Sequence, residues 1–300
     1  MNLNKNVLAP ICLFTFNRLE ETIKTISALK NNHLANQSDL FIFSDGFINK
    51  SEEKKVQEVR KYLNSLAGFN SITIFESESK KGLAKSVIEG VSKMFEEFDS
   101  IIVLEDDLIT SPNFLNFMNQ SLKFYENNDS IMSISGYTLD LKSLKNINKD
   151  YYIGLRASSW GWATWKKEWV NIDWEVKNHS VIKYNLFKRI KFMKGGSDLP
   201  KMLRNQQSGK INSWAIRWCY HQFINKKYTV FASSSKIMNI GYGSNATNTK
   251  KTKRFYTDLD NSNQIDFSFD NEIKFNDSLL REFRQKFSIL NRIKDKLIKL

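Results

Sequence analysis

Three acidic residues, Glu105, Asp106 and Asp107, follow a run of apolar residues in the segment "SIIVLEDDLITSP" (100–112). The apolar run predicts a buried strand, so the three carboxylates, here called the acid cluster, would stand together where that strand ends. Buried charges of one sign need a compensating cation, which is either a basic side chain or a metal ion. Carboxylate oxygens suit Mg²⁺ or Mn²⁺. The plainer alternative is that the acids pair with lysines or lie beside the start of the next helix.

Polar residues also close two other predicted strands. The first is followed by Thr15, Asn17 and Arg18, and the second ends in "FSDG" with Asp45. The carboxyl ends of parallel strands meet at one edge of a sheet, and ligands bind there. We therefore expect these residues to converge with the acid cluster on one crevice. A divalent ion held there would offset the charge of a nucleotide diphosphate and stabilise a departing phosphate.

The elements that must position these residues follow from the spacing of apolar residues. Strands are predicted at residues 8–16, 39–46, 71–77, 100–107 and 130–137, and amphipathic helices at residues 19–32, 52–68 and 82–98. Alternation of strands and helices predicts an α/β fold with a mostly parallel sheet that is covered by helices on both faces.

Composition narrows the function classes. The chain has 300 residues, of which 41% are hydrophobic, and it contains no apolar run of transmembrane length. The start "MNLNKNVLAP" lacks the apolar core of a signal peptide. Cys12 and Cys219 each lie in an apolar stretch and predict buried free thiols in a reducing, cytoplasmic compartment. The three histidines, His33, His179 and His221, are too scattered to predict a metal site.

The net charge of +13 suggests an anionic partner. Nucleic acid, an anionic membrane surface and a polyphosphate ligand would each fit, and simple solubility is also sufficient. Basic residues alternate with acidic ones along the predicted helices, and no recognised nucleic-acid-binding motif is present. We therefore expect no nucleic-acid partner.

Several segments in a fixed order resemble a known family. They are "ICLFTFNRLEETIKTI", "FIFSDG", "KKGLAKSVIEGV", "IIVLEDDLITSPNF", "SSWGWATWKKEW", "INSWAIRW" and "SKIMNIG". Together they resemble glycosyltransferases of the GT-A fold, in particular the group related to N-acetylglucosaminyltransferase I and the bacterial glycosyltransferase family 2 enzymes. The resemblance covers residues 7–245; each motif alone is weak, and the ordered set is specific.

The resemblance implies a role for each residue of the expected crevice. Asp107 would bind the metal, Mn²⁺ or Mg²⁺, which bridges the two phosphates of the donor. Asp45 would bind the base or ribose, and Glu105 would face the ribose or the sugar. The full set implied to bind the nucleotide sugar is Thr15, Asn17, Arg18, Asp45, Lys81, Gly82, Leu83, Glu105 and Asp106.

An inverting transfer needs a general base to take the proton of the acceptor hydroxyl. Members of the group often carry an acid just before the Trp of the segment that here is "INSWAIRW", where this chain has Asn212 and Ser213. Neither side chain is a competent base. Asp173, in "NIDWEV", is the substitute candidate, and Glu168 is the second. A surface acid paired with a lysine is the alternative for Asp173.

All seven tryptophans lie between Trp160 and Trp218. Aromatic clusters usually form core, but indole rings also stack on the apolar faces of sugars. Trp160 and Trp162 are the candidates for sugar contact, with space left beside them by Gly161. The other tryptophans are expected to pack in the core.

We expect residues 1–137 to form the nucleotide-sugar-binding half of the domain, residues 138–250 the acceptor-side half and residues 251–300 a C-terminal extension. From residue 281 to 300, apolar residues recur every three or four positions and predict one helix with an apolar stripe and a basic face. The stripe consists of Phe283, Phe287, Leu290, Ile293, Leu297 and Leu300. Such a helix either lies on an anionic membrane at the inner face of the cell membrane or packs onto the domain.

The sequence thus favours a metal-dependent glycosyltransferase that uses a nucleotide diphosphate sugar, expected to be UDP-linked. The resemblance implies transfer of a hexose or N-acetylhexosamine, with inversion, to a glycan acceptor that is carried on a lipid, in bacterial surface polysaccharide (lipopolysaccharide or capsule) synthesis. The alternatives are a carbohydrate-binding protein without catalysis and a sugar-nucleotide pyrophosphorylase. The second lacks support because "LAPICLFTFNRLEET" has none of the glycines of a phosphate-binding loop.

Overall fold

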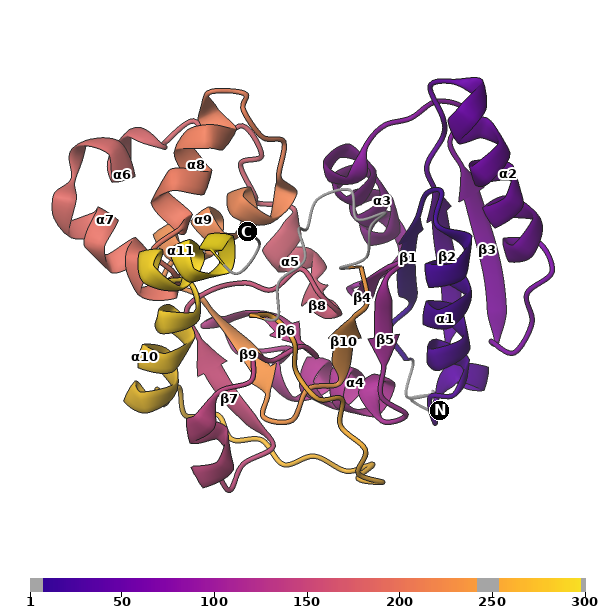
Figure 1. Ribbon diagram of the computed structural model, residues 1–300. Helices are drawn as coiled ribbons and strands as arrows, with labels where there is room; N and C mark the ends of the chain where they lie inside the picture. Colours follow the sequence, from indigo (N-terminus) through magenta and orange to yellow (C-terminus); the bar gives the residue numbers. More distant parts are fainter. Residues whose placement is uncertain (1–7, 242–253, 298–300) are drawn as a thin grey trace.

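A mixed eight-stranded sheet runs through the computed structural model, which describes residues 8–241 and 254–297, with the side chains of 294–297 excepted (Figure 1). The strands in sheet order are β3 (Ser71–Glu76), β2 (Asp39–Ser44), β1 (Ile11–Thr15), β4 (Ser100–Glu105), β8 (Trp162–Trp165), β6 (Ile131–Ser135), β9 (Tyr228–Ala232) and β7 (Tyr151–Gly154). Only β8 and β7 run against the other strands. The predicted α/β class with a mainly parallel sheet is confirmed.

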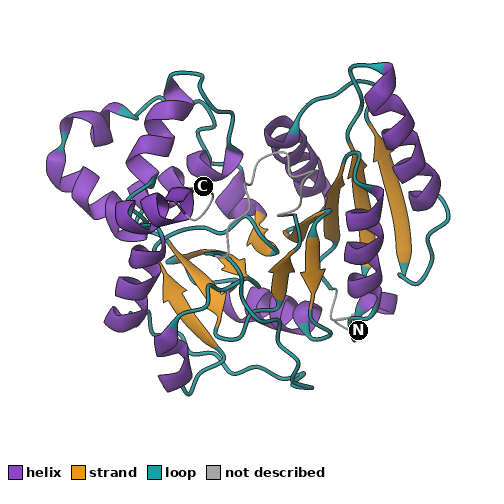
Figure 2. Ribbon diagram, viewed as in Figure 1, coloured by secondary structure: helices purple, strands orange, loops and turns teal. Residues whose placement is uncertain are grey.

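Helices lie on both sides of the sheet (Figure 2). They are α1 (Leu19–Lys30), α2 (Lys50–Leu63), α3 (Leu83–Glu97), α4 (Phe114–Tyr125), α5 (Lys166–Trp169), α6 (Ser180–Tyr184), α7 (Leu186–Phe192), α8 (Leu199–Gln207), α9 (Trp214–Ile224), α10 (Asp277–Lys286) and α11 (Ile289–Leu297). Short 3₁₀ turns are η1 (Ala35–Gln37), η2 (Lys142–Asn146) and η3 (Met193–Gly195). The five predicted strands and three predicted helices all form, within a few residues of their expected ends.

Each face of the sheet has its own hydrophobic core. Successive residues of a central strand pack into different cores, because their side chains point to opposite faces. In β1, Ile11 and Leu13 pack with α1, α4 and α10 on one face. Cys12 and Phe14 pack with α3 and α9 on the other face. Both cysteines are buried free thiols, as predicted. Burial raises the pKa of the Cys219 thiol to about 11, so it stays protonated at neutral pH.

The chain beyond residue 137 completes the same sheet instead of forming a separate layer. β8 lies between β4 and β6 and pairs antiparallel with both. Its Trp162 is 1% exposed and packs 4.4 Å from Trp218 and 5.0 Å from Trp214, measured between ring centroids. This aromatic core, which includes Trp169, holds α9 against the sheet.

The C-terminal region forms two helices where the sequence predicted one. The predicted stripe is split by a break after α10, where the Ser288 hydroxyl accepts a hydrogen bond from the Asn291 amide. Phe283 and Phe287 are each 8% exposed and pack in the core, so the membrane interpretation is wrong for them. Leu290 is 72% exposed. The side chains of Leu297 and Leu300 lie outside the described residues.

No helix in the described part of the chain is long and apolar enough to cross a bilayer.

A buried ion pair fastens the chain after residue 254 to the core. Lys236, at the start of β10 (Ile237–Asn239), is 2% exposed and pairs with the Asp260 carboxylate. Asn113 also donates to Asp260, at 3.0 Å. Burial raises the pKa of Asp260, but the hydrogen bonds from Lys236 and Asn113 outweigh this and hold it below its usual range.

The Asp260→Asn substitution is expected to lower the free energy of unfolding by about 3–5 kcal/mol, because it leaves a buried ammonium without its counter-charge. Urea denaturation measures the change. Glu126→Gln is the matched control, since it removes the partner of Lys123 in an exposed pair that contributes at most about 1 kcal/mol. A loss in Asp260→Asn no greater than in the control would contradict the structural role of the buried pair.

Candidate active site

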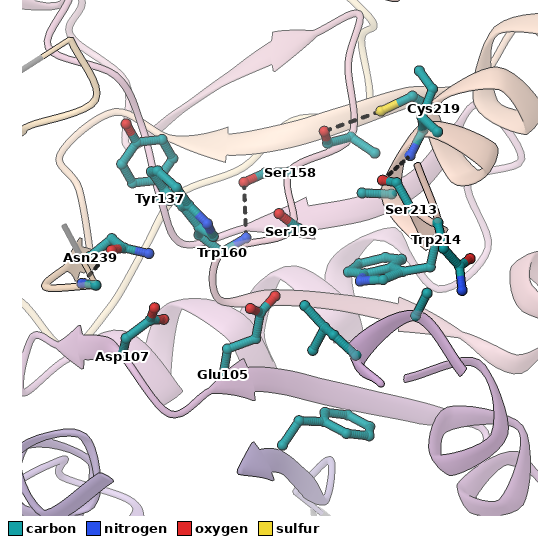
Figure 3. A pocket seen from close by; sticks show the side chains of 18 of the residues that line it. Glu105, Asp107, Tyr137, Ser158, Ser159, Trp160, Ser213, Trp214, Cys219 and Asn239 are labelled. Carbon is teal, nitrogen blue, oxygen red and sulfur yellow. Dashed lines mark hydrogen bonds between the residues drawn. The ribbon is translucent and has the colours of Figure 1, made fainter. Parts of the chain in front are cut away.

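One cavity of about 880 Å³ opens at the carboxyl ends of β1, β2 and β4. Thr15, Asp45 and the acid cluster all line it, so the predicted convergence of three strand ends is observed. The opposite wall comes from the second half of the chain. Figure 3 shows Glu105 and Asp107 on one side of the cavity and Tyr137 and Trp160 across from them.

Arg18 supplies the cation that the acid cluster requires. Its guanidinium pairs with the Asp106 carboxylate and, at 3.0 Å, with Oδ2 of Asp107. Burial raises the pKa of Asp106 to about 6, although Arg18 opposes that rise. Burial and the negative charges of Asp107 and Asp106 raise the pKa of Glu105 well above its usual range. One guanidinium therefore compensates three carboxylates only in part.

Several buried oxygen atoms at this end of the cavity have no hydrogen-bond partner among the residues that the structure describes. They are Oγ1 of Thr15, Oδ2 of Asp106 and Oδ1 of Asp107. Buried polar atoms are nearly always satisfied in native proteins, so unpaired ones at a cavity wall mark a place for a ligand.

A divalent cation fits the donor set at Asp107 and Asp106. Mg²⁺ is usually held by one or two carboxylates together with substrate phosphates, and these two residues each keep an unpaired oxygen. Within residues 8–241 and 254–297, no three or more His, Cys, Asp or Glu side chains are placed so that together they could hold a metal ion. The protein alone would thus provide an incomplete shell that a phosphate could complete.

A small two-stranded sheet brings a later segment over Asp107. β5 (Leu108–Thr110) pairs antiparallel with β10, and the amide of Ile240 donates to the Asp107 carbonyl at 2.9 Å. A Cβ atom at Gly241 would lie 2.0 Å from Oδ2 of Asp107. Only glycine therefore allows the backbone to pass this close to the carboxylate.

Asp45 holds the segment that begins α3. Its two carboxylate oxygens accept hydrogen bonds from the backbone amides of Lys81 at 2.7 Å and Gly82 at 2.9 Å. Gly82 has a φ of +78°, which favours glycine. The first turn of α3 lines the cavity, so the Asp45 carboxylate fixes where the unpaired amides of that turn point.

The site residues predicted from sequence fall into two groups, according to whether they line the cavity. Those that line the cavity are Thr15, Arg18, Asp45, Gly82, Leu83, Glu105, Asp106, Asp107 and Trp160. Those absent from the described lining are Asn17, Lys81, Gly161, Trp162, Glu168 and Asp173. Lys81 points elsewhere, with Nζ 2.8 Å from Glu89.

Neither candidate for the general base lies at the cavity. The Asp173 carboxylate accepts hydrogen bonds from the amides of Glu175 at 3.0 Å and Lys177 at 2.7 Å, which closes a turn at the surface. Glu168 is 3% exposed, and its Oε1 lies 2.7 Å from Nζ of Lys227. Both carboxylates have local structural partners.

The two candidate sugar-stacking tryptophans have different positions. Trp160 lines the cavity and packs edge-on against Tyr137, 4.7 Å away between ring centroids. Trp162 belongs to the aromatic core. Gly161 leaves no open space, since a Cβ there would lie 2.4 Å from Ile237; close packing against β10 explains this glycine.

Several cavity residues received no binding role from the sequence. They are Tyr137, Arg156, Asn212, Asn239 and Gly241 among polar or small residues, and Phe283 and Phe287 among apolar ones. Asn239 and Gly241 lie in "SKIMNIG", which the resemblance had singled out without assigning roles. The sequence allowed Phe283 and Phe287 to pack onto the domain, but it could not show that they reach the cavity, because they lie in and directly after α10, far along the chain.

Comparisons with known proteins leave the family open. No family model matches the chain, and no curated protein matches it either. Among solved structures, it is similar to the mannosyltransferase PcManGT from Pyrobaculum calidifontis in complex with GDP-Man and Mn²⁺. That similarity has a TM-score of 0.40 at 8% sequence identity and covers 72% of this chain and 75% of the other.

The Asp45→Ala substitution is expected to speed hydrogen exchange at the Lys81 and Gly82 amides about tenfold or more, because hydrogen bonds to a charged acceptor contribute roughly 1.5–3 kcal/mol. Exchange measured by NMR or mass spectrometry checks this. Asp39→Ala is the control, since Asp39 begins the same strand and its carboxylate accepts from the side chains of Asn70 and Ser71, not from the backbone amides at 81–82. Unchanged exchange at 81–82 in Asp45→Ala would show that the Asp45 carboxylate does not hold these two amides in place.

Proposed function

We propose that the protein is a metal-dependent glycosyltransferase that uses a nucleoside diphosphate sugar. The observation that carries this proposal is the acid cluster at the end of β4, where Asp106 and Asp107 each keep an unpaired oxygen in a cavity large enough for a nucleotide sugar. The ordered motifs that resemble GT-A glycosyltransferases, one of which contains the acid cluster, also support it.

Each part of the cavity has a task under this proposal. Asp107, with Asp106, would hold a divalent ion, which supplies positive charge to the diphosphate when bound. The Asp45 carboxylate holds the first turn of α3 at the cavity, where backbone amides can donate to an anionic ligand. Thr15 offers a free hydroxyl, and Arg18 keeps the acid cluster together.

The wall formed by Trp160 and Tyr137 would face the sugar or the acceptor. Apolar aromatic surface there excludes water, which protects an activated sugar from hydrolysis. We further propose a UDP-linked hexose or N-acetylhexosamine as donor and a glycan, carried on a lipid, as acceptor, with inversion. A carbohydrate-binding protein without catalysis remains the second candidate, because Trp160 lines the same cavity.

The Asp107→Ala substitution is expected to abolish the Mn²⁺-dependent part of nucleotide binding while the protein stays folded. Calorimetric titration of UDP and GDP, with and without Mn²⁺, measures this. Asp99→Ala is the matched control, because Asp99 precedes the other end of β4 and is exposed. Binding of manganese and nucleotide to Asp107→Ala as tight as to the parent would refute the metal assignment.

The reaction itself is tested by incubation with a panel of nucleotide sugars and measurement of released nucleotide. Binding of a free glycan without any response to nucleotide or metal would favour the carbohydrate-binding alternative.

The Asp173→Asn substitution separates two roles. A general base would cause a steep fall in kcat with unchanged donor affinity. We expect instead that kcat changes less than about threefold and that thermal stability falls, because this carboxylate closes a turn. Steady-state kinetics and thermal unfolding of the same preparation distinguish the two outcomes.

A further inference from the structure

Four large apolar side chains project into solvent from α6 and α7. Tyr184 is 76% exposed, Leu186 66%, Phe187 80% and Ile190 52%. In α7, Phe192 is the buried apolar residue and anchors the helix against Tyr220 and Phe223. Single exposed apolar residues are ordinary, but a group of four on two successive short helices marks a surface that meets a partner.

The same segment is strongly basic. Residues 180–197 contain Lys183, Lys188, Arg189, Lys191 and Lys194 and no acidic residue. No salt bridge between described residues involves any of the five. Their charge is therefore directed at solvent or at a partner.

The start of α11 adds to this surface. Ile289, Leu290 and Ile293 are 58%, 72% and 47% exposed. The hydroxyl of Ser197, two residues beyond η3, donates to the Phe287 carbonyl at 2.8 Å. This bond joins the beginning of α11 to the turn that follows α7. Figure 1 shows α6, α7 and α8 grouped at one end of the molecule, away from α1 and α2.

We propose that this surface docks onto an anionic lipid bilayer. We call it the basic–apolar face and define it by Tyr184, Leu186, Phe187, Ile190, Ile289, Leu290 and Ile293 with Lys183, Lys188, Arg189, Lys191 and Lys194. Aromatic and aliphatic side chains of such a face enter the headgroup region, and lysine and arginine contact anionic headgroups. The long stems of the lysines can lie along the apolar surface while their charges stay in water.

The chemistry of the face favours a bilayer over two other partners. The phosphates of a nucleic acid would pair with the cations, and its bases could stack on Tyr184 or Phe187. The aliphatic side chains of Leu186, Ile190 and Leu290 would make no favourable contact with it. A second copy of the chain would bring five cations against the same five across a two-fold axis, which is repulsive. A bilayer uses both components at once.

The segment that carries most of the basic–apolar face is followed closely in sequence by residues that line the cavity. α8 follows η3 directly, and its Leu199 and Met202 line the cavity. A protein docked by this face would hold the second-half wall of the cavity near the membrane. The docking proposal stands on exposure and charge alone, so it is tested separately from any enzymatic activity.

The test is sedimentation of the full chain with vesicles of phosphatidylcholine, either pure or with about 30% phosphatidylglycerol, whose headgroups give the surface a negative potential. We expect binding to the anionic vesicles at low salt, with weaker binding at high salt and none to pure phosphatidylcholine. The double variant Phe187→Ser with Ile190→Ser should lower the partition coefficient about tenfold or more. Lys188→Gln with Arg189→Gln should lower it several-fold and reduce its salt dependence.

Matched controls are Ile48→Ser, at a residue that is 75% exposed in the other half of the molecule, and Lys54→Gln with Lys55→Gln on α2. These should leave binding unchanged, and all variants should keep the parental melting temperature, since the side chains are exposed. A loss in Lys54→Gln with Lys55→Gln equal to that in Lys188→Gln with Arg189→Gln would show attraction by net charge only. A loss in Ile48→Ser equal to that in Phe187→Ser with Ile190→Ser would show that the position of the apolar residue does not matter. Either result would overturn the proposal.

Three other results would also overturn it. The first is a parent protein that ignores anionic vesicles at low salt. The second is a dimer, seen by sedimentation velocity, that Phe187→Ser with Ile190→Ser dissociates. The third is nucleic acid binding, seen by electrophoretic shift, that survives at salt concentrations where vesicle binding is already lost.

Discussion

The contact on which the candidate site depends is the one between Arg18 and the acid cluster. Buried carboxylates repel one another, and each also loses its hydration. Arg18 pairs with two of them and so allows β4 to end in three acids beside β1. Because one guanidinium cannot compensate three carboxylates, the site keeps a surplus of negative charge and unpaired oxygens. That surplus is the ground on which we propose a divalent cation at the end of β4.

Three further contacts shape the cavity beside the acid cluster. The Asp45 carboxylate is turned toward the amides of 81–82 and fixes the start of α3. Gly241 lets the chain after β10 pass directly over Asp107. The aromatic core under β8 keeps the second half of the sheet in register, so that Trp160 faces Glu105 and Asp107 across the cavity (Figure 3).

The C-terminal region and the α6–α7 segment share one feature: in each, some apolar residues are buried in the core and others are exposed to solvent. Phe283, Phe287 and Phe192 anchor these helices to the core. The neighbouring apolar residues, Phe187 and Leu290 among them, remain outside next to lysine and arginine. A helix whose apolar residues serve only to pack against the core would bury them. The exposure of these residues therefore indicates a contact outside the fold itself.

The sequence by itself determined the elements of the first half, because strand and helix periodicities are local and strong there. It also placed Thr15, Asp45 and the acid cluster at one crevice, since parallel strands share their carboxyl edge. Only the tertiary structure decided that Arg18 pairs with Asp106 and Asp107, that Asp45 clamps 81–82, and that Asp173 closes a surface turn. The first two outcomes depend on contacts between residues far apart in the chain, which no local pattern records. The turn at Asp173 is local, with the amides of Glu175 and Lys177 as donors, and only the fold shows that it lies at the surface and away from the cavity. The break between α10 and α11 was likewise decided by packing, because Phe283 and Phe287 find partners in the core and Leu290 does not.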